Sequence, residues 1–338
     1  MKELDSIYYH DGIAGQEDSV RNFIIENIEG KCEIHVDNMG NVIALKKGKQ
    51  RAKNKVMLSA HMDEVGFIIT NITDDGYLKF DCVGGIDSAV VCGKRVSVGE
   101  KGILGVIGVN HVHLLESGEH GKVPKISQMY IDIGADSKEQ ASEFVEIGDA
   151  AYFLHTCKEF GDNKFACKAL DDRFGCRVML ELIQGELEYD LNFAFLVQEE
   201  VGLRGAAAAC HQIEPDYAIV IEATTANDIA YVSEENQVCT LGGGAVVSFM
   251  DRATVYNYSL YKKAMKLAKD NNIKAQTKTT IAGGNDAGAI HKSLGGVHTL
   301  TVSLPCRYIH SGTCVADKTD MKSCEDLVKV LAEDFANA

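Results

Sequence analysis

Carboxylates and imidazoles stand where short apolar runs of this sequence end. In the clearest case, the apolar run 191–197 is followed by Gln198 and then by two adjacent acids, Glu199 and Glu200. Five polar groups of this kind occur, and four of them directly follow an apolar run: His61-Met62-Asp63-Glu64, Asp171-Asp172-Arg173, Gln198-Glu199-Glu200, Glu222 and His310. In an open α/β sheet the carboxyl ends of the strands form the crevice that binds ligands. The pattern therefore predicts a polar site at one edge of such a sheet.

Two parts of the chain, before residue 66 and after residue 161, alternate helical and extended patterns. Val20, Phe23, Ile24 and Ile28 recur at helical spacing, and Gly30 follows as a helix stop. Further helices are predicted at 173–187, 260–268 and 324–331, and buried strands at 56–60, 191–197, 217–221 and 297–304. Buried strands separated by helices indicate a doubly wound sheet, so an α/β fold is predicted.

The segment between residues 66 and 161 has a different sequence pattern. Short β-like runs there are separated by glycine and aspartate: 67–70, 77–83, 94–98, 103–108, 129–133 and 151–154. Regular short strands between turn residues are typical of a small β-rich module. We therefore expect one α/β domain, formed by residues 1–66 and 162–338, that is interrupted by a β-rich insertion at 67–161.

The composition disfavours several classes of partner. The net charge of −15 leaves no basic face of the kind that binds nucleic acid. No apolar stretch approaches the length that spans a bilayer, and the first residues lack the apolar run of a signal peptide. The eleven cysteines are scattered singly, which favours free and mostly buried thiols. We expect a cytoplasmic, reduced protein with no membrane or nucleic-acid partner.

Two imidazoles and three carboxylates among the polar groups would suit a pair of divalent cations. Zinc and cobalt accept nitrogen and oxygen ligands, and one carboxylate can bridge two ions. A spare carboxylate can act as a general base. Because Glu199 and Glu200 are adjacent, one can bind metal while the other faces the substrate. Each motif alone also fits a solvated strand end or a hydrogen-bonded core histidine, so the prediction depends on their joint occurrence.

Other chemistries have less support in the residues. Cys306 and Cys314 flank the last polar group, but cysteine is abundant throughout, which disfavours a cysteine nucleophile. The run 242–244 is Gly-Gly-Gly and is interpreted as a turn or hinge, because no Gly-Lys-Ser/Thr follows it to form a phosphate loop. The close pair His111 and His113 matches no motif and is interpreted as ordinary polar residues.

Five motifs occur in this order, and all but the fourth contain one of the polar groups: Ser59-Ala-His61-Met-Asp63-Glu-Val-Gly66, Lys168-Ala-Leu-Asp171-Asp-Arg-Phe-Gly175, Gln198-Glu-Glu200-Val-Gly-Leu-Arg-Gly205, Gly283-Gly-Asn-Asp286-Ala-Gly288 and Arg307-Tyr-Ile-His310-Ser311. Together they resemble the tetrahedral (TET) family of metallo-aminopeptidases, relatives of the glutamyl and leucyl aminopeptidases. The resemblance covers nearly the whole chain. It implies a catalytic α/β domain with a mixed sheet flanked by helices, formed by residues 1–66 and 162–338, and a dimerisation domain at 67–161.

The resemblance also implies the metal ligands: His61 and Glu222 for one ion, Glu200 and His310 for the second, and Asp171 as the bridge. Asp63 would accept a hydrogen bond from the His61 ring, and Glu199 would be the general base that moves a proton from the bridging water to the leaving amine. Two divalent ions, zinc or cobalt with manganese also suitable, would anchor the free amino group of short peptide substrates. Asp172 and Arg173 are expected to form a structural acid–guanidinium pair near the site.

The sequence departs from the family pattern at Glu222, where the family usually has Asp, and at Gly312 and Ser88, where it usually has Pro. Two other functions stay open. Another two-metal amidohydrolase, such as a deacylase, would not need a free N-terminal amine in its substrate. A catalytically inactive peptide-binding scaffold would have lost a ligand or the base. The resemblance further implies a homo-oligomer built from dimers, with a hollow tetrahedral dodecamer as the larger assembly of the family.

Overall fold

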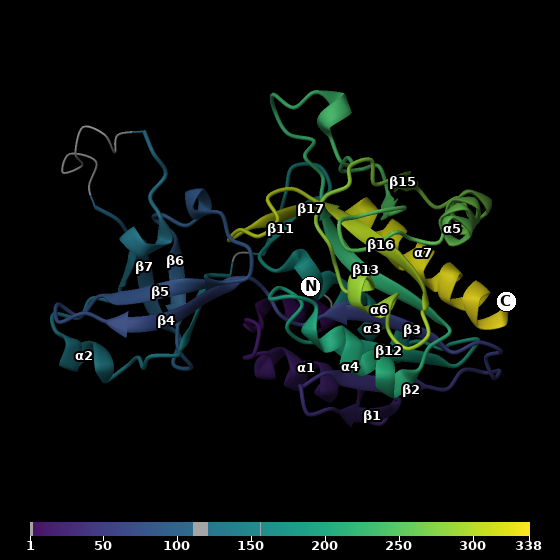
Figure 1. Cartoon of the computed structure of the whole chain (residues 1–338), viewed down its shortest axis with the longest axis horizontal. Coiled ribbons are helices and arrows are strands. Elements are labelled where there is room, and N and C mark those ends of the chain that lie inside the picture. Colours follow the sequence, from purple (N-terminus) through teal and green to yellow (C-terminus); the bar gives the residue numbers. More distant parts are fainter. Residues whose placement is uncertain (1–2, 111–120, 156) are drawn as a thin grey trace.

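The computed structural model describes residues 3–110, 121–155 and 157–338, so His111 and His113 lie outside the described residues. An eight-stranded sheet forms the centre of the larger part of the molecule (Figure 1). In spatial order its strands are β1 (Glu33–Val36), β2 (Val42–Lys46), β12 (Leu191–Leu196), β3 (Val56–His61), β13 (Tyr217–Thr225), β16 (His298–Cys306), β14 (Ala245–Val247) and β15 (Ala275–Thr277).

The sheet is mixed, with a parallel centre. Strands β12, β3, β13 and β16 are neighbours and run parallel. Strand β2 pairs antiparallel with β12 on one side, and β14 pairs antiparallel with β16 on the other. The predicted α/β fold with a mixed sheet flanked by helices is therefore confirmed. All four strands predicted outside the insertion form this parallel centre, because buried parallel strands are the most continuously apolar.

Helices cover both faces of the sheet because its central strands are apolar on both sides. In β3, Val56, Leu58 and Ala60 pack into one core, whereas Met57 packs into the core on the other face. The first core also holds residues of α1 (Asp18–Ile28), α3 (Leu170–Gln184), α5 (Tyr258–Asp270) and α7 (Lys318–Asn337), and the second holds residues of α4 (Arg204–Ile213) and α6 (Ala287–Ile290). Within the described residues, no helix is long and apolar enough to cross a membrane.

The helix predictions hold, with shifts at the ends. All four apolar residues that predict the first helix are buried in α1, and those that predict the last helix are buried in α7. Helix α3 begins at Leu170 and ends before Gly185, so the predicted range of 173–187 is displaced toward the C-terminus. The described residues also form short 3-10 helices: η1 (Glu3–Tyr9), η2 (Ser88–Val90), η4 (Ile126–Gln128) and η5 (Glu234–Asn236).

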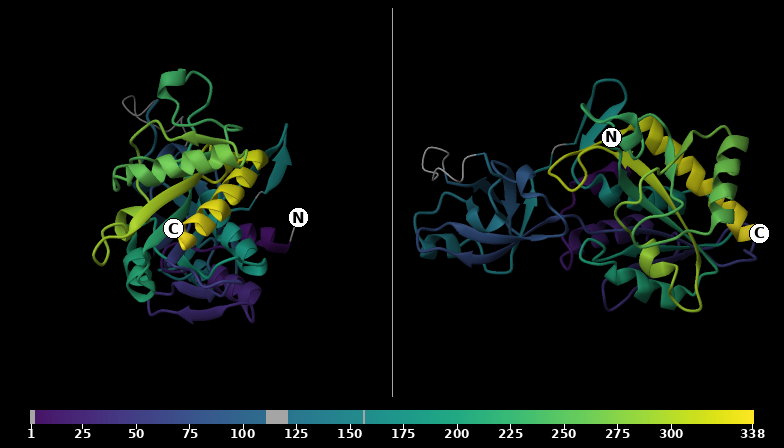
Figure 2. Two further views of the ribbon diagram at one scale, coloured as in Figure 1. Left: turned by 90° about the vertical axis from the view of Figure 1, so that its right-hand side faces the viewer. Right: turned by 45° about the horizontal axis from the view of Figure 1, so that its top comes forward.

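A closed six-stranded barrel lies beside the sheet (Figures 1 and 2). Its strands are β4 (Gly66–Ile72), β5 (Leu78–Val83), β6 (Arg95–Val98), β7 (Ile103–Gly108), β8 (Tyr130–Asp132) and β9 (Ala150–Phe153), and α2 (Lys138–Ser142) packs against it. All six β-like runs of the sequence are barrel strands. Phe67 packs edge-on against Phe80 and Phe153 at ring distances of 5.0 and 5.1 Å, within a core separate from those of the sheet. The division of the chain at residues 67 and 161 stays a prediction.

A small three-stranded sheet connects the end of the barrel to α3. It consists of β10 (Lys158–Phe160), β11 (Lys164–Cys167) and β17 (Cys314–Asp317). Antiparallel pairing of β10 with β11 brings Cys157 and Cys167 to facing positions, and the two form a disulfide. The prediction of free thiols throughout is therefore wrong for this pair. It holds for the other nine cysteines, six of which are buried.

Candidate metal centre and adjoining pocket

The predicted site residues converge at the carboxyl edge of the parallel centre. His61 is the last residue of β3, Glu199 and Glu200 follow β12, and His310 follows β16. Because these strands are parallel and adjacent, their ends lie at the same edge of the sheet. The sequence prediction of one polar site at this edge is thus met by chain segments that are far apart in sequence.

Glu222 does not follow the end of its strand, as the sequence pattern indicated. Strand β13 continues to Thr225, because its pairing with β16 runs on to Thr225 and Cys306. Glu222 therefore projects from the strand itself, and its Oε1 lies 3.5 Å from Nε2 of His61. The apolar run ends at Ile221 because Glu222 already points into the site, although the strand itself continues to Thr225.

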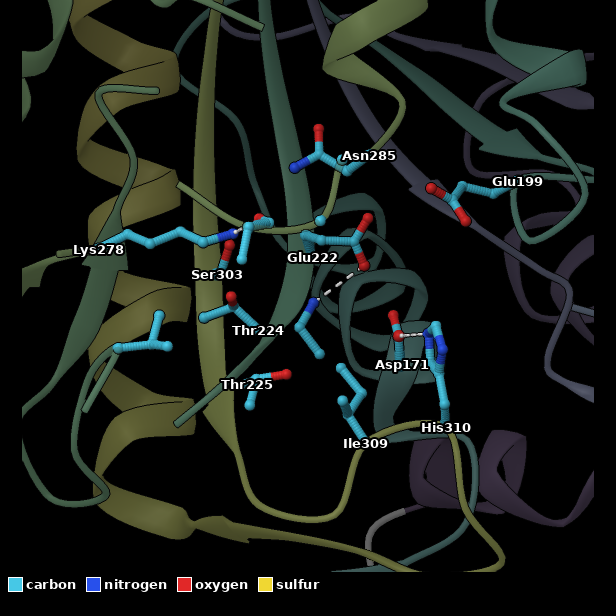
Figure 3. Close-up of a pocket in the computed structure, with 15 residues that line it drawn as sticks. Asp171, Glu199, Glu222, Thr224, Thr225, Lys278, Asn285, Ser303, Ile309 and His310 are labelled. Atoms are coloured by element: carbon cyan, nitrogen blue, oxygen red, sulfur yellow. Dashed lines mark hydrogen bonds and ion pairs between the residues drawn. The ribbon is translucent and has the colours of Figure 1, made fainter. Parts of the chain in front are cut away.

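Asp171 lies between the two imidazoles. Its Oδ1 is 3.2 Å from Nε2 of His61, and its Oδ2 is 3.2 Å from Nε2 of His310, the contact that Figure 3 marks. Asp171 stands in the first turn of α3, and its peptide bond to Asp172 is cis. Nε2 of His310 also lies 3.5 Å from Oε2 of Glu200. One carboxylate thus faces a different imidazole with each of its oxygens.

Among the described residues, three groups of side chains could hold a metal ion, with ligand atoms that lie within 4.8 Å of one another. These groups are His61 with Asp171 and Glu222, Asp171 with Glu200 and His310, and His61 with Glu199 and Glu200. The first two share Asp171 and together contain all five predicted ligands. The third shows that Glu199, the predicted general base, also lies close to two of these ligands. Imidazole nitrogen and carboxylate oxygen are donors that suit zinc and similar divalent ions.

The site concentrates buried acids. Burial raises the pKa of Glu199 and of Glu222 well above the ordinary range and raises the pKa of Glu200 to about 7. Burial opposes protonation of His61, but the charge of Glu222 and the contact with Asp171 still raise the pKa of His61 well above its usual value. A bound cation would offset the mutual repulsion of these carboxylates, so the electrostatics fit a cation site.

Backbone carbonyls orient both imidazoles. Nδ1 of His61 lies 3.0 Å from the carbonyl oxygen of Asp63, and Nδ1 of His310 lies 2.9 Å from the carbonyl oxygen of Gly85. A ring that donates from Nδ1 keeps Nε2 unprotonated and available as a ligand. The carboxylate of Asp63 is farther from the His61 ring, with Oδ1 at 3.5 Å from Nδ1. The backbone of Asp63 thus makes the shorter of its two contacts with this ring.

The Asp63 carboxylate has a second set of contacts that the sequence pattern does not indicate. Its two oxygens accept hydrogen bonds from the backbone N–H groups of Glu199 and Glu200, each at 3.0 Å. Gln198, which precedes them, has a left-handed backbone with φ of 58°. Asp63 therefore fixes the turn that presents both glutamates after β12.

Asp172 and Arg173 do not pair with each other. Arg173 is fully buried, and its Nη2 lies 3.3 Å from Oε1 of Glu64, which also accepts a hydrogen bond from Lys168 at 2.8 Å. Asp172 instead accepts a hydrogen bond from the backbone N–H of Gly175 at 2.9 Å. The expected acid–guanidinium pair therefore involves Glu64, because the N-terminal turn of α3 directs Arg173 toward the segment after β3.

A cavity of about 220 Å³ adjoins the candidate metal-ligating side chains (Figure 3). Its lining includes Asp171, Glu199, Glu222 and His310 together with residues that the sequence pattern does not single out as a site: Thr224, Thr225, Lys278, Asn285, Ser303 and Ile309. Asn285 belongs to the fourth motif, so its sequence context was a reason to expect it near the site. Lys278 has no such signal, because it directly follows the three-residue strand β15.

The chain is similar to known proteins over most of its length. Residues 40–327 match the M42 glutamyl aminopeptidase family. The chain is 33% identical over 336 residues to the lysyl aminopeptidase of Pyrococcus furiosus, covering 96% of this chain and 94% of that protein. A TET aminopeptidase from a marine sediment archaeon of the Thaumarchaeota has a structure with a TM-score of 0.92 and 32% identity, covering 98% of each chain.

A second solved structure is that of the TET1 peptidase of Pyrococcus horikoshii, which can assemble into a tetrahedron or a large octahedral shell. It gives a TM-score of 0.85 with 34% identity, covering 97% of this chain and 98% of that one. The family match and the relatives establish a peptide hydrolase of the exopeptidase class. This chain belongs to the M42 glutamyl aminopeptidase family.

Proposed function

We propose that this aminopeptidase binds two divalent metal ions and uses Glu199 as its general base. The observation that carries the proposal is the position of Asp171 between the imidazoles of His61 and His310, at 3.2 Å from each. A carboxylate that offers one oxygen to each of two ligand groups is the arrangement that a bridging ligand requires. His61 and Glu222 would complete one set of ligands, and Glu200 and His310 the other.

The donor set also fits the expected ions. Two nitrogen donors and three carboxylates suit zinc, cobalt or manganese better than calcium or magnesium, which favour oxygen ligands alone. Glu in place of the usual Asp at Glu222 supplies the same donor on a longer stem. Its Oε1 still comes within 3.5 Å of Nε2 of His61, so the longer side chain is compatible with a shared site.

The protein residues have separate tasks in peptide hydrolysis. Bound divalent ions would polarise the scissile carbonyl and lower the pKa of the attacking water. Glu199 lines the cavity beside Asp171 and Glu222, where its carboxylate takes a proton from this water and gives it to the leaving amine. Asp63 holds the backbone of Glu199 through the 3.0 Å hydrogen bond and so keeps the base at the edge of the cavity.

The proposal extends to the assembly. The barrel stands beside the catalytic sheet, and the P. horikoshii relative assembles into closed shells. We infer that this chain forms dimers through the barrel, and that a tetrahedral dodecamer is the larger state to test for. The cytoplasmic location stays a prediction from the sequence.

The test is peptide hydrolysis after metal exchange. Protein stripped by a chelator and resupplied with zinc, cobalt or manganese is assayed on short peptides with free or acetylated N-termini. We expect each active metal to restore cleavage of the free peptides only, and Glu199→Gln to remove it without loss of bound metal. Cleavage of acetylated peptides would indicate a deacylase instead. No turnover with any metal would indicate a binding scaffold.

A further inference from the structure

Lys168 is a buried cation of the second motif, and the candidate metal centre does not use it as a ligand. It lies between β11 and α3, three residues before Asp171, and its side chain is 1% exposed. Its ammonium group donates hydrogen bonds to both carboxylate oxygens of Glu64, each at 2.8 Å, and to Asp11. All three N–H donors of the ammonium group are thereby used, so the acids around Lys168 fix its position.

Glu64, which accepts two of these hydrogen bonds, belongs to the first motif. It lies three residues after His61, and its side chain is also buried. The Lys168–Glu64 ion pair therefore joins the segment that carries His61 to the segment that carries Asp171. These two candidate ligands lie 3.2 Å apart, from Nε2 to Oδ1, so a small shift of either segment would change how they face a shared ion.

The same ammonium group also contacts the part of the chain that leaves the barrel. It lies 5.5 Å from the ring centre of Tyr152 in β9. Asp11, its other acidic partner, lies 3.1 Å from Nε2 of His155, which follows that strand. Glu64 stands where the chain enters the barrel at β4, so Lys168 reaches both connections between the barrel and the large sheet.

The charges of this cluster balance. Lys168 and Arg173 are the cations, and Glu64 and Asp11 are the acids. Arg173 has further acceptors in two backbone carbonyls. A buried ion pair usually stabilises a fold no more than apolar side chains of similar volume, because both charges lose their water. Stability is therefore a weak reason for this pair, and a fixed geometry is a better one.

We propose that Lys168 is a positioning residue that sets the distance between His61 and Asp171 by holding Glu64. It acts through the two segments that its ion pair joins, not through contact with the substrate. This inference rests on the proposed two-metal function, because the distance matters when the two residues share an ion. Groups that orient metal ligands change metal affinity or activity by roughly 10- to 100-fold when they are removed.

The test separates position from stability with two single variants and one double variant. Lys168→Met removes the cation, Glu64→Gln removes its acid and keeps an acceptor for the backbone N–H of Gly12, and the double variant removes both charges. We expect a lower Tm in each single variant, because a buried charge loses its partner, and recovery of most of that loss in the double variant. The zinc affinity of stripped protein and kcat/KM should fall roughly 10- to 100-fold in all three variants.

Arg177→Met is the matched control. Arg177 is a buried cation on α3 that pairs with Asp5 at 2.8 Å and with Glu325. This variant should have a lower Tm and an unchanged zinc affinity. Recovery of zinc affinity and kcat/KM together with Tm in the double variant would overturn the proposal, because the pair would then only stabilise the fold. Wild-type zinc affinity and kcat/KM in Lys168→Met would overturn it directly.

Two safeguards keep the outcomes distinct. Lys168→Gln replaces Lys168→Met if that variant does not fold, and the double variant carries the test if neither single variant of Lys168 folds. Stripped wild type that neither binds zinc nor regains peptide cleavage would reject the two-metal function and this inference with it. Wild type that does both, with variants that match it, would reject only the role of Lys168.

Discussion

Nδ1 of His310 lies 2.9 Å from the carbonyl oxygen of Gly85, so the turn after barrel strand β5 orients a candidate metal ligand that follows β16. The barrel touches the same loop again at Gly312, where an added Cβ would lie 3.0 Å from the ring of Phe153 in β9. The turn after β5 and a residue of β9 therefore both lie against the segment around His310. A displacement of the barrel would change the orientation of this imidazole.

Gly84 is the position where this relationship is easiest to disturb. Its φ is +86°, and an added Cβ would lie 2.8 Å from Val65 and 3.3 Å from the Cβ of Glu200. We expect Gly84→Ala to lower kcat/KM by more than 10-fold and to weaken metal binding, because both Glu200 and the Gly85 carbonyl must shift. Steady-state kinetics and metal titration measure the two effects.

Gly134→Ala is the control for the backbone strain alone. Gly134 has a φ of +76°, and its added Cβ would have no neighbour within 4 Å. We expect this variant to lose about 1–2 kcal/mol of stability with little change in activity. Equal loss of activity in both variants would show that the effect of Gly84→Ala is not local to the site.

Asp63→Asn tests the carboxylate that holds the turn of the two glutamates. An amide has only one acceptor oxygen, so the backbone N–H of Glu199 or Glu200 would lose its partner. We expect a cost of about 1–3 kcal/mol in folding free energy and a kcat at least 10-fold lower. Asp37→Asn is the control, since Asp37 also accepts backbone N–H bonds, from Met39 and Gly40, away from the site. It should reduce stability but not kcat.

Asp11 gives a prediction for acid stability. Burial would raise the pKa of Asp11, but its contacts with His155 and Lys168 lower it to about 2. The folded state therefore binds fewer protons than the unfolded state, whose aspartate has a pKa of about 3.9. The stabilisation, about 2 kcal/mol, is present above pH 5 and is lost as pH falls toward 2. Urea unfolding of wild type and Asp11→Asn should show a difference that shrinks between pH 5 and pH 3, and a constant difference would contradict the pKa.

The strands with continuous apolar runs could be predicted from the sequence, and the edge strands could not. β3 is buried at every residue, whereas β1 has one partly buried residue among exposed ones, and β14 and β15 have three residues each. Helix α4 escaped prediction because its buried face consists mostly of glycine and alanine, whose small side chains are a weak apolar signal in a sequence. Such elements are defined by their neighbours in the fold, which local patterns do not encode.

The residues of the candidate site likewise fall into two groups, those that local sequence patterns select and those that only the folded chain brings to the site. His61, Glu199 and Glu200 follow predictable strands, so local pattern was enough to select them. Lys278 joins the cavity only because β15 pairs with β14, and the carboxylate of Asp63 reaches Glu199 only because β12 lies beside β3. These contacts depend on strand order, which becomes visible only in the folded chain.

Metal removal should destabilise the protein, because the buried acids of the site then lose the cation that offsets their mutual repulsion. Asp171, Glu222 and the Glu200 side chain are almost fully buried. Binding of metal to the folded state alone adds about 2.7 kcal/mol to the free energy of unfolding when the free metal is 100-fold above its Kd.

We expect zinc to raise the Tm of stripped wild type, and Glu222→Gln to bind fewer ions per chain with a smaller rise. Glu222→Asp should keep the full stoichiometry, because it retains the donor. A Glu222→Gln protein that binds as much zinc as wild type would exclude Glu222 as a ligand, and the His61 set would then need another donor.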